Sequence, residues 1–362
     1  MQQDKSDPNQ STTSPVRKAA NDNSYFDPTI PGGAALRGDR VLFHFVDAVS
    51  CETLEQLAKG VLDKFGGWPS DPVQQRKLGK HAKRELKSGV PDLVSDLLKV
   101  RHGTADAMHV TGLPEETNIA RVLMLAMSRC VGDIYNFAGQ NGGELIMKLV
   151  PKADGGENNN AAPGEFAMHS DDAAIPRDAR VHCIALMGRK NPPGVATHYA
   201  PLSWALKKMA SENGNKARRA LQVLSVPRFQ FAFPISLGAG EGIWTRPRPI
   251  ISMGPDRRWE ISFPSYNTRT VSPSDTEGKE MMAWLLRSLE AVKISVEVQP
   301  GSFFAFSNLR GTHSRDNISG GDREIWRTYG IESLAGLRNL TGEHGPIFPI
   351  EPLVKLAAND NA

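Results

Sequence analysis

Cysteine, long apolar runs and an excess of charge of one sign are all scarce in this sequence. Only three of the 362 residues are cysteine (Cys51, Cys130 and Cys183), and no two of them form a Cys-X-X-Cys pair. This spacing supports neither a disulfide framework nor a structural zinc site. No apolar run reaches the roughly 18 residues of a transmembrane helix, and the N-terminus lacks the apolar core of a signal peptide. We therefore expect a cytoplasmic protein without a membrane partner.

The charge balance is nearly even, because 43 Lys and Arg residues face 40 Asp and Glu residues. A net charge of +3 is too small to indicate a polyanion partner, so we expect no nucleic-acid binding. The densest basic stretch, residues 76–87, contains six Lys and Arg residues and one Glu, but no aromatic side chain for stacking on bases. We interpret it as a solvated helix face. No sequence feature indicates the oligomeric state.

The composition divides the chain into three parts. Residues 1–24 are polar and almost free of large apolar side chains, which predicts a disordered arm. Residues 25–350 carry the apolar material of a core and contain no linker, so we expect a single domain there. Residues 351–362 are expected to form a flexible tail.

Within this domain, helical patterns come first and β-rich runs follow. Apolar residues recur at three- and four-residue steps over 52–131, which predicts helices. Residues 132–335 consist of short β-rich runs, interrupted by helical patterns at 201–223 and 274–292. The expected strands are 145–150, 181–187, 229–233, 259–263, 294–298 and 302–306. This order predicts a mainly β protein, with a barrel or sandwich core and flanking helices.

Two histidines and a carboxylate form the most informative pattern. His169 ends a predicted strand, and Asp171 follows two residues later, so that both side chains project from the same face. A third ligand from His313, which follows the strand at 302–306, would complete a set of two imidazoles and one carboxylate. Such a set leaves coordination positions open, and it suits an Fe(II) ion that must bind a co-substrate and O₂.

Two arginines follow at a four-residue spacing in a strand-like segment. By strand alternation Arg323 and Arg327 share one face, about 13 Å apart if the segment is extended. Buried guanidinium groups are costly unless each meets a carboxylate. A dicarboxylate co-substrate and a carboxylate-bearing substrate would supply two such partners. Internal salt bridges to acidic side chains are the structural alternative.

The segment Phe137–Tyr329 resembles the clavaminate synthase-like iron(II)/2-oxoglutarate dioxygenases, near the hydroxylases of free arginine, asparagine or lysine. The motifs that carry the resemblance occur in the family's order: Gln140-Asn-Gly-Gly-Glu144, His169-Ser-Asp171-Asp172, the turn that leads to Thr197, His313, and Asp322-Arg323-X-X-X-Arg327-X-Tyr329. The resemblance implies a double-stranded β-helix, a jelly-roll core of cupin type. It also implies hydroxylation of an unactivated C–H bond of a free amino acid or amino-acid derivative, with release of succinate and CO₂.

The resemblance further implies a role for each matching residue. His169, Asp171 and His313 would bind Fe(II), and Arg323 and Thr197 would bind 2-oxoglutarate. The residues implied in substrate binding are Arg327, Gln140, Glu144, Asp172 and Glu260. The spacing after His313 would instead favour Arg327 as the 2-oxoglutarate anchor, which leaves the order of the two arginines open.

Two other classes of protein remain as alternatives. One is a non-catalytic cupin-type module that binds a metal or a small molecule. The other is a related dioxygenase that desaturates or cyclises a carboxylate other than an amino acid. A non-catalytic module would not require Arg323, Arg327 and Thr197 together, so these residues favour an enzyme.

Overall fold

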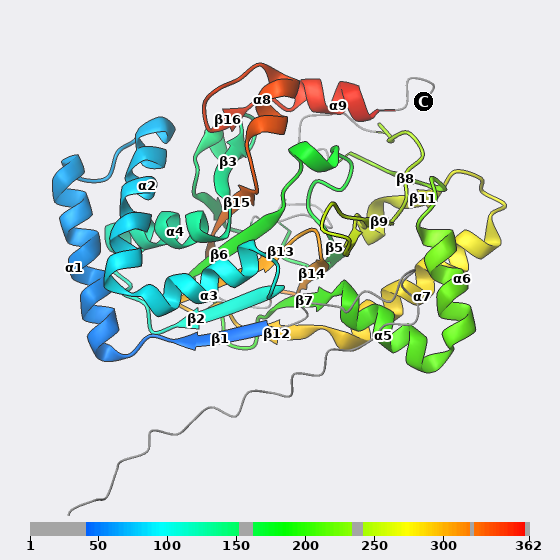
Figure 1. Ribbon diagram of the computed structural model, residues 1–362, viewed down its shortest axis with the longest axis horizontal. Coiled ribbons are helices and arrows are strands. Elements are labelled where there is room, and N and C mark those ends of the chain that lie inside the picture. Colours follow the sequence, from blue (N-terminus) through cyan, green and yellow to red (C-terminus); the bar gives the residue numbers. More distant parts are fainter. Residues whose placement is uncertain (1–40, 152–161, 234–241, 319–321, 359–362) are drawn as a thin grey trace, which may run out of the picture.

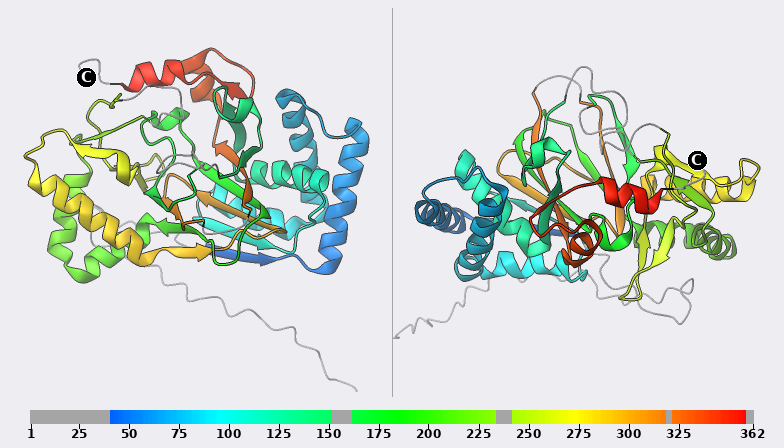
Figure 2. Two further views of the ribbon diagram at one scale, coloured as in Figure 1. Left: turned by 180° about the vertical axis from the view of Figure 1, so that it is seen from behind. Right: turned by 90° about the horizontal axis from the view of Figure 1, so that it is seen from above.

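Two β-sheets face each other at the centre of the molecule, and helices cover their outer sides (Figure 1). The computed structural model describes residues 41–151, 162–233, 242–318 and 322–358. Seen from behind and from above, one group of helices lies on one side of the sheets and a second group lies on the other (Figure 2). The predicted class, mainly β with flanking helices, is therefore the observed one.

The larger sheet has eight strands, and both of its faces are covered. Its order is β1 (Val41–Phe45), β2 (Ala107–Thr111), β13 (Ser302–Ser307), β6 (Cys183–Lys190), β15 (Glu324–Ile331), β3 (Asp133–Phe137) and β16 (Ile347–Phe348), with β4 (Met147–Leu149) beside β15. Along β13, Phe304 and Phe306 join one apolar core while Phe303 and Ala305 join the other. A strand buried on both faces has no polar alternation, which explains why residues 303–306 form an unbroken apolar run.

The smaller sheet has the order β12 (Ile294–Val296), β7 (Thr197–Pro201), β14 (Gly311–Arg315) and β5 (Phe166–His169). It packs against the larger sheet through aromatic side chains, since the ring of Tyr199 in β7 lies 5.2 Å from that of Phe306 in β13. Two short ribbons complete the strands: β8 (Phe229–Phe231) with β11 (Thr268–Thr270), and β9 (Ile251–Met253) with β10 (Trp259–Ile261).

The helices form two groups that match the two cores. The first group is α1 (Ala48–Phe65), α2 (Pro72–Gly89), α3 (Pro91–Arg101) and α4 (Thr117–Val131). Helix α4 is buried nearly all round, because it lies between the other three helices and the larger sheet. The second group is α5 (Leu202–Glu212), α6 (Gly214–Leu224) and α7 (Thr276–Val292); α5 and α7 pack on the smaller sheet, and α6 packs on these two helices. No helix of the described residues is long and apolar enough to cross a bilayer.

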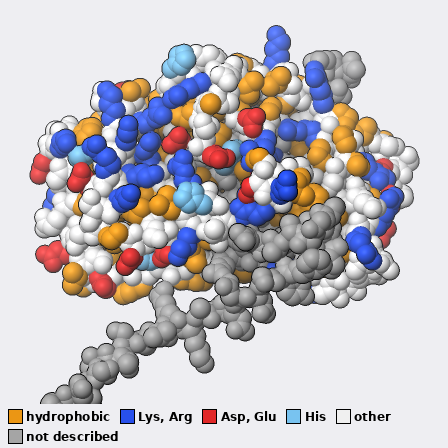
Figure 3. All heavy atoms as spheres, viewed as in Figure 1, with side chains coloured by type: hydrophobic (Ala, Val, Ile, Leu, Met, Phe, Trp, Pro, Cys, Tyr) orange, Lys and Arg blue, Asp and Glu red, His pale blue; other side chains and the backbone are white. Residues whose placement is uncertain are grey.

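The helix starts follow from local sequence. Asp71 caps α2 by accepting a hydrogen bond from the Gln74 amide at 2.9 Å, and Pro72 occupies the first turn, where its missing N–H costs nothing. Asp275 caps α7 in the same way through the Gly278 amide. The basic stretch 76–87 lies within α2, and Lys and Arg side chains gather over this helix on the face seen in Figure 3.

Three predictions about elements need correction. A parallel pair of strands, β1 and β2, accompanies the expected helices of the N-terminal half, so this region is not purely helical. The helix expected at 201–223 is two helices, because Asn213 ends α5 and its side chain caps α6. The expected flexible tail is ordered at its start: α9 (Glu351–Ala357) buries three apolar side chains and follows α8 (Ala335–Thr341). The predicted arm at residues 1–24 lies outside the described residues, and the single domain stays a prediction.

Candidate active site

His169 and His313 lie opposite each other on neighbouring antiparallel strands. They are register partners in the β5–β14 pair, and side chains directly opposite in such a pair point to the same face. Their ring centroids are 4.1 Å apart. The rings of Phe166 and Phe306 lie 3.9 Å from His169 and 5.0 Å from His313, respectively. Both imidazoles are thus held in a buried aromatic environment between the two sheets.

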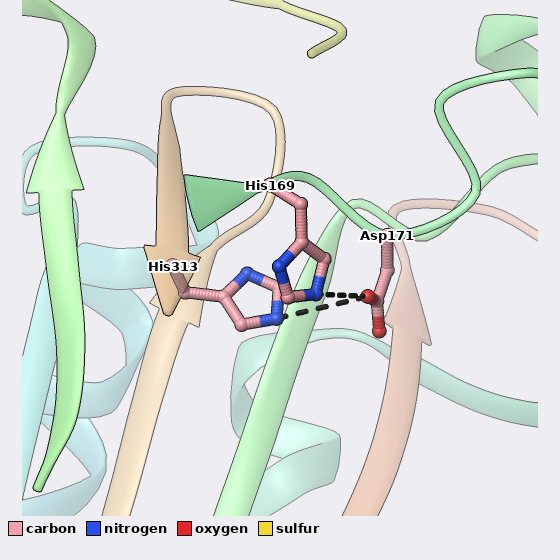
Figure 4. Close-up of side chains that lie close together, drawn as sticks. All are labelled: His169, Asp171 and His313. Carbon is pink, nitrogen blue, oxygen red and sulfur yellow. Dashed lines mark ion pairs between the residues drawn. The ribbon is translucent and has the colours of Figure 1, made fainter. Parts of the chain in front are cut away.

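Asp171 brings a carboxylate to the two imidazoles (Figure 4). Its Oδ1 lies 3.1 Å from His169 Nε2 and 3.6 Å from His313 Nε2. Each of the three residues offers a ligand atom within 4.8 Å of the others. Two atoms that bind one ion at about 2.1 Å and at right angles lie about 3 Å apart. The three side chains can therefore hold one metal ion.

The protonation states of these residues fit a metal ion. His169 Nδ1 lies 2.7 Å from the carbonyl oxygen of Ala167 and donates to it, which leaves the lone pair on Nε2. This Nε2 is buried and faces Asp171 Oδ1 at 3.1 Å. Burial and the nearby charge of His169 lower the pKa of His313 to about 3, so that its imidazole is neutral. Burial alone would raise the pKa of Asp171, but the contact with His169 and the charges of His313 and Arg327 hold it well below its usual range.

Strand β15 holds the second oxygen of the same carboxylate. Asp171 Oδ2 accepts a hydrogen bond from Tyr329 Oη at 2.9 Å and one from Arg327 Nη1 at 3.2 Å. Both donors come from the larger sheet, whereas His169 and His313 come from the smaller one. The carboxylate therefore bridges the two sheets and turns a single oxygen toward the imidazoles.

Asn308 fixes the main chain at Asp171, and sequence reasoning did not identify it. Its Oδ1 accepts from the Asp171 amide at 2.8 Å, and its Nδ2 donates to the carbonyl oxygens of Asp171 at 2.9 Å and Val181 at 2.8 Å. The side chain is 1 % exposed, and all of its donors and its acceptor are used. The available signal was a lone amide directly after a strand with the apolar centre 303–306, where a polar side chain must find buried partners.

Two buried arginines, Arg323 and Arg315, lie close together near the start of β15. Arg323 donates from Nε to Asn191 Oδ1 at 3.2 Å, and no carboxylate of the described residues pairs with it. Burial, and then the charge of Arg315, lower the pKa of Arg323 to about 9. Asn191 also donates from Nδ2 to the carbonyl oxygen of Val195 at 2.8 Å, which closes the turn before Thr197. Thr197 is itself buried and is the register partner of Arg315.

Asp172 is buried beside the candidate metal site without a cationic hydrogen-bond partner among the described residues. It adopts a left-handed conformation (φ 54°), which is uncommon for a residue other than glycine and marks a sharp turn after Asp171. Its Oδ2 has no hydrogen-bond partner in the described part of the chain. Burial, and then the charge of Asp171, raise the pKa of Asp172 to about 8.

The other predicted substrate residues are placed less favourably. Gln140 precedes a short 3₁₀ turn (Asn141–Gly143), and Glu144 after it is exposed; within the described residues, neither side chain hydrogen-bonds to the three candidate ligands. Glu260 is fully buried, and its carboxylate accepts from Arg177 Nε at 2.9 Å and Nη2 at 2.8 Å, with Arg180 at 3.7 Å. This carboxylate is already paired, which argues against the predicted substrate contact.

Three comparisons place this geometry among known proteins. No family model matches the chain, and no curated protein matches it either. Solved structures do match. One is an asparagine oxygenase in complex with Fe(II), 2S,3S-3-hydroxyasparagine and succinate, with 20% identity and a TM-score of 0.73; the match covers 85% of this chain and 99% of that one.

Two further matches are structures of the non-heme iron oxygenase OrfP. The complex with Fe, succinate and (3S)-hydroxy-L-Arg has 17% identity and a TM-score of 0.69. The complex with Fe and alpha-ketoglutaric acid has 18% identity and a TM-score of 0.69. Each match covers 84% of this chain and 99% of the other. The chain therefore has the fold of these oxygenases, which confirms the predicted cupin-like double-stranded β-helix.

Replacement of His313 by Ala should weaken Fe(II) binding by on the order of a hundredfold or more, because one of three ligands is lost from an otherwise intact site. The fold should survive, since the pairing of β14 with β5 and β7 is made by the backbone and does not need the imidazole. Anaerobic Fe(II) titration and thermal unfolding measure the two effects. His109→Ala, at another strand histidine outside the site, is the control; equal Fe(II) affinity in both variants would exclude His313 as a ligand.

Replacement of Asn308 by Asp should weaken Fe(II) binding by roughly ten- to a hundredfold, because an oxygen in place of Nδ2 repels the carbonyl oxygens of Asp171 and Val181. Thr328→Val is the matched control, since Thr328 in β15 is also buried and donates to Ser128 Oγ at 2.8 Å. Both variants should lose stability. Only Asn308→Asp should lose metal affinity. An equal loss of Fe(II) affinity in both variants would show that Asn308 has a purely structural role.

Proposed function

We propose that this chain is an Fe(II)- and 2-oxoglutarate-dependent dioxygenase that hydroxylates an unactivated C–H bond of a free amino acid. The observation that carries the proposal is a juxtaposition within one fold. Two imidazoles and a carboxylate converge, and a buried guanidinium without a carboxylate partner among the described residues comes from the adjoining end of β15. The first group suits an iron ion, and the second suits a dicarboxylic acid.

His169, Asp171 and His313 would hold the iron on one face and leave the opposite positions open for 2-oxoglutarate and O₂. With these co-substrates, Fe(II) supplies the oxidative decarboxylation of 2-oxoglutarate to succinate and CO₂ that is coupled to hydroxylation of the substrate. The protein supplies orientation and a site shielded from water. Tyr329 and Arg327 hold the second oxygen of Asp171, which keeps the carboxylate a ligand through one oxygen.

Arg323 would bind the distal carboxylate of 2-oxoglutarate. A buried guanidinium is stable only with an anionic partner, and the amide of Asn191 does not supply the missing charge. The hydrogen bond from Arg323 to Asn191 orients the guanidinium, while the buried hydroxyl of Thr197 offers a second donor. Arg327 is less suited to this role, because Asp171 already pairs with it.

Arg327 and Asp172 would bind the charged head of an amino acid. Arg327 uses Nη1 for Asp171, whereas its buried Nε has no hydrogen-bond partner among the described residues and remains available for a substrate carboxylate. The unpartnered Oδ2 of Asp172 would accept from the α-ammonium group, and the positive charge of that group would favour the ionised carboxylate. One cation and one carboxylate at the same site match a zwitterion, and the asparagine and arginine ligands named for the matching structures support this substrate class.

This geometry also bears on the alternatives. A non-catalytic metal-binding module has no use for a buried guanidinium that lacks a carboxylate partner. Desaturation and cyclisation would use the same iron and 2-oxoglutarate site, so the site itself does not distinguish these reactions from hydroxylation. We propose hydroxylation because the molecules bound in the matching oxygenases include hydroxylated amino acids. We also propose a cytoplasmic location, which the three unpaired cysteines support.

Succinate formation tests the proposal directly. Purified protein with Fe(II), ascorbate and 2-oxoglutarate should release succinate in the presence of one or a few members of a panel of free amino acids, and the same amino acid should gain one oxygen atom by mass spectrometry. The His313→Ala variant is the control for free iron. Succinate release that no amino acid stimulates would contradict the proposed substrate class.

Conservative replacement separates the two arginines, because Lys keeps the charge but not the bidentate geometry. Arg323→Lys should raise the KM for 2-oxoglutarate, and Arg327→Lys should raise the KM for the amino acid, each by about 30-fold to several thousandfold, since loss of a buried carboxylate partner costs roughly 2–5 kcal/mol. Steady-state kinetics measure both constants, and each variant is the control for the other. Exchanged effects would make Arg327 the 2-oxoglutarate anchor.

A further inference from the structure

Five cationic side chains from α2, α3, α4 and α8 lie near one another, on residues that the proposed function does not use. We call this group the basic cluster; its members are Arg76 and Lys83 of α2, Arg101 of α3, Arg129 of α4 and Arg338 of α8. Figure 3 shows Lys and Arg side chains gathered over α2 on this face of the molecule. The overall net charge is only +3, so a local group of cations is not a consequence of the composition of the whole chain.

Helix periodicity creates one side of the basic cluster. Arg76, Lys80, Lys83 and Lys87 are spaced by four, three and four residues in α2, which aligns them on one face. Arg76 and Lys83 are half-buried against the neighbouring elements, whereas Lys80 and Lys87 are exposed. The stretch that the sequence suggested to be a solvated face therefore turns part of its charge inward.

Arg129 lies at the centre of the basic cluster. Its side chain crosses Gly79 of α2, where an added Cβ would come within 3.1 Å of Arg129 Cδ. Lys83 Nζ donates to the Arg129 carbonyl oxygen at 2.8 Å, and Arg101 Nη1 donates to the same oxygen at 3.5 Å. The arginine side chain is only 11% exposed, and its nearest carboxylate contact is Asp133 Oδ1, 3.8 Å from Nη2.

The basic cluster has an excess of positive charge. Burial lowers the pKa of Arg76, and the charge of Arg338 lowers it further. Burial likewise lowers the pKa of Arg129; Asp133 opposes this shift, while Arg76 and Arg101 add to it. Among the described residues, Asp133 is the one carboxylate that acts on Arg76, Lys83 and Arg129. Three cations of the basic cluster, Arg76, Lys83 and Arg129, thus share one carboxylate.

Helix capping explains only part of this arrangement. The last carbonyl groups of a helix lack intrahelical donors and attract cations, which accounts for Lys83 and Arg101 at the C-terminal end of α4. It does not account for Arg76 or Arg338. Nor does it account for the buried Nε and Nη1 of Arg129 and Nε of Arg338, which have no hydrogen-bond partner among the described residues. Buried donors without partners are costly, and an anionic ligand would satisfy them.

We propose that the basic cluster binds a small anion that carries two or more phosphate groups. Guanidinium groups bind phosphate oxygens through paired hydrogen bonds, and several guanidiniums from different helices suit several phosphates. A compact ligand fits better than a nucleic acid, because the central cation is nearly buried and the basic stretch of α2 contains no aromatic side chain for base stacking.

The test compares two double variants with equal charge loss in the full-length chain. Arg76→Gln with Arg338→Gln removes two members that are not needed for capping α4. Lys77→Gln with Arg84→Gln removes two cations of α2 that lie roughly 80–100° away around the helix. Inorganic pyrophosphate is the probe, and its binding is measured by calorimetry and by the shift in unfolding temperature, at constant ionic strength.

Pyrophosphate should bind the unmodified protein and raise its unfolding temperature. Binding should weaken by about tenfold or more in the Arg76/Arg338 variant and by no more than about twofold in the Lys77/Arg84 variant. The variant Arg76→Lys with Arg338→Lys retains the charge, so it should bind with intermediate affinity even if the Gln variant is unstable. ATP as a second probe distinguishes a nucleotide from an inorganic phosphate, and either result supports the site. Three results would overturn the proposal. They are the absence of pyrophosphate binding, equal weakening of binding in both Gln variants, and binding of citrate as tight as that of pyrophosphate.

Discussion

The carboxylate of Asp171 is the interaction on which the candidate site depends. It is buried between two sheets that approach from different parts of the chain, with Oδ1 toward the imidazoles of the smaller sheet and Oδ2 held by Tyr329 and Arg327 of the larger one. Asn308 fixes the main chain on either side of it. Because a buried carboxylate is stable only with such partners, the two sheets must come together at this point for the site to exist.

The other charged groups buried near Asp171 can be described by whether each has a partner of opposite charge. Asp171 is compensated by Arg327 within the described residues, whereas Arg323 has no carboxylate partner and Asp172 has no cationic hydrogen-bond partner there. A dicarboxylate and a zwitterion would supply the missing charges one by one. Uncompensated groups of this kind reduce the stability of the empty protein, which is a common cost of a site prepared for charged ligands.

The sequence predicted the parts of this structure that depend on local spacing. Strand alternation joins His169 to Asp171, and apolar periodicity locates most helices and strands. The sequence did not predict the role of Asn308, because its hydrogen-bond partners lie more than a hundred residues away along the chain. The position of one amide after a strand does not show which groups it will contact. The same limit explains why Glu260 was predicted to bind substrate: nothing in the local sequence shows that Arg177 and Arg180 pair with its carboxylate. Nor does the sequence predict helix α9, because a seven-residue helix depends on tertiary packing for its stability.

The fate of molecular oxygen tests the central claim most directly. With the responsive amino acid, Fe(II) and 2-oxoglutarate under oxygen-18 gas, a dioxygenase of this kind places one labelled atom in succinate and the other in the hydroxylated amino acid. Mass spectrometry of both products from one reaction measures this distribution. Our account predicts label in both products and equal amounts of the two products. Formation of unlabelled succinate, or of a hydroxylated product without succinate, would contradict it.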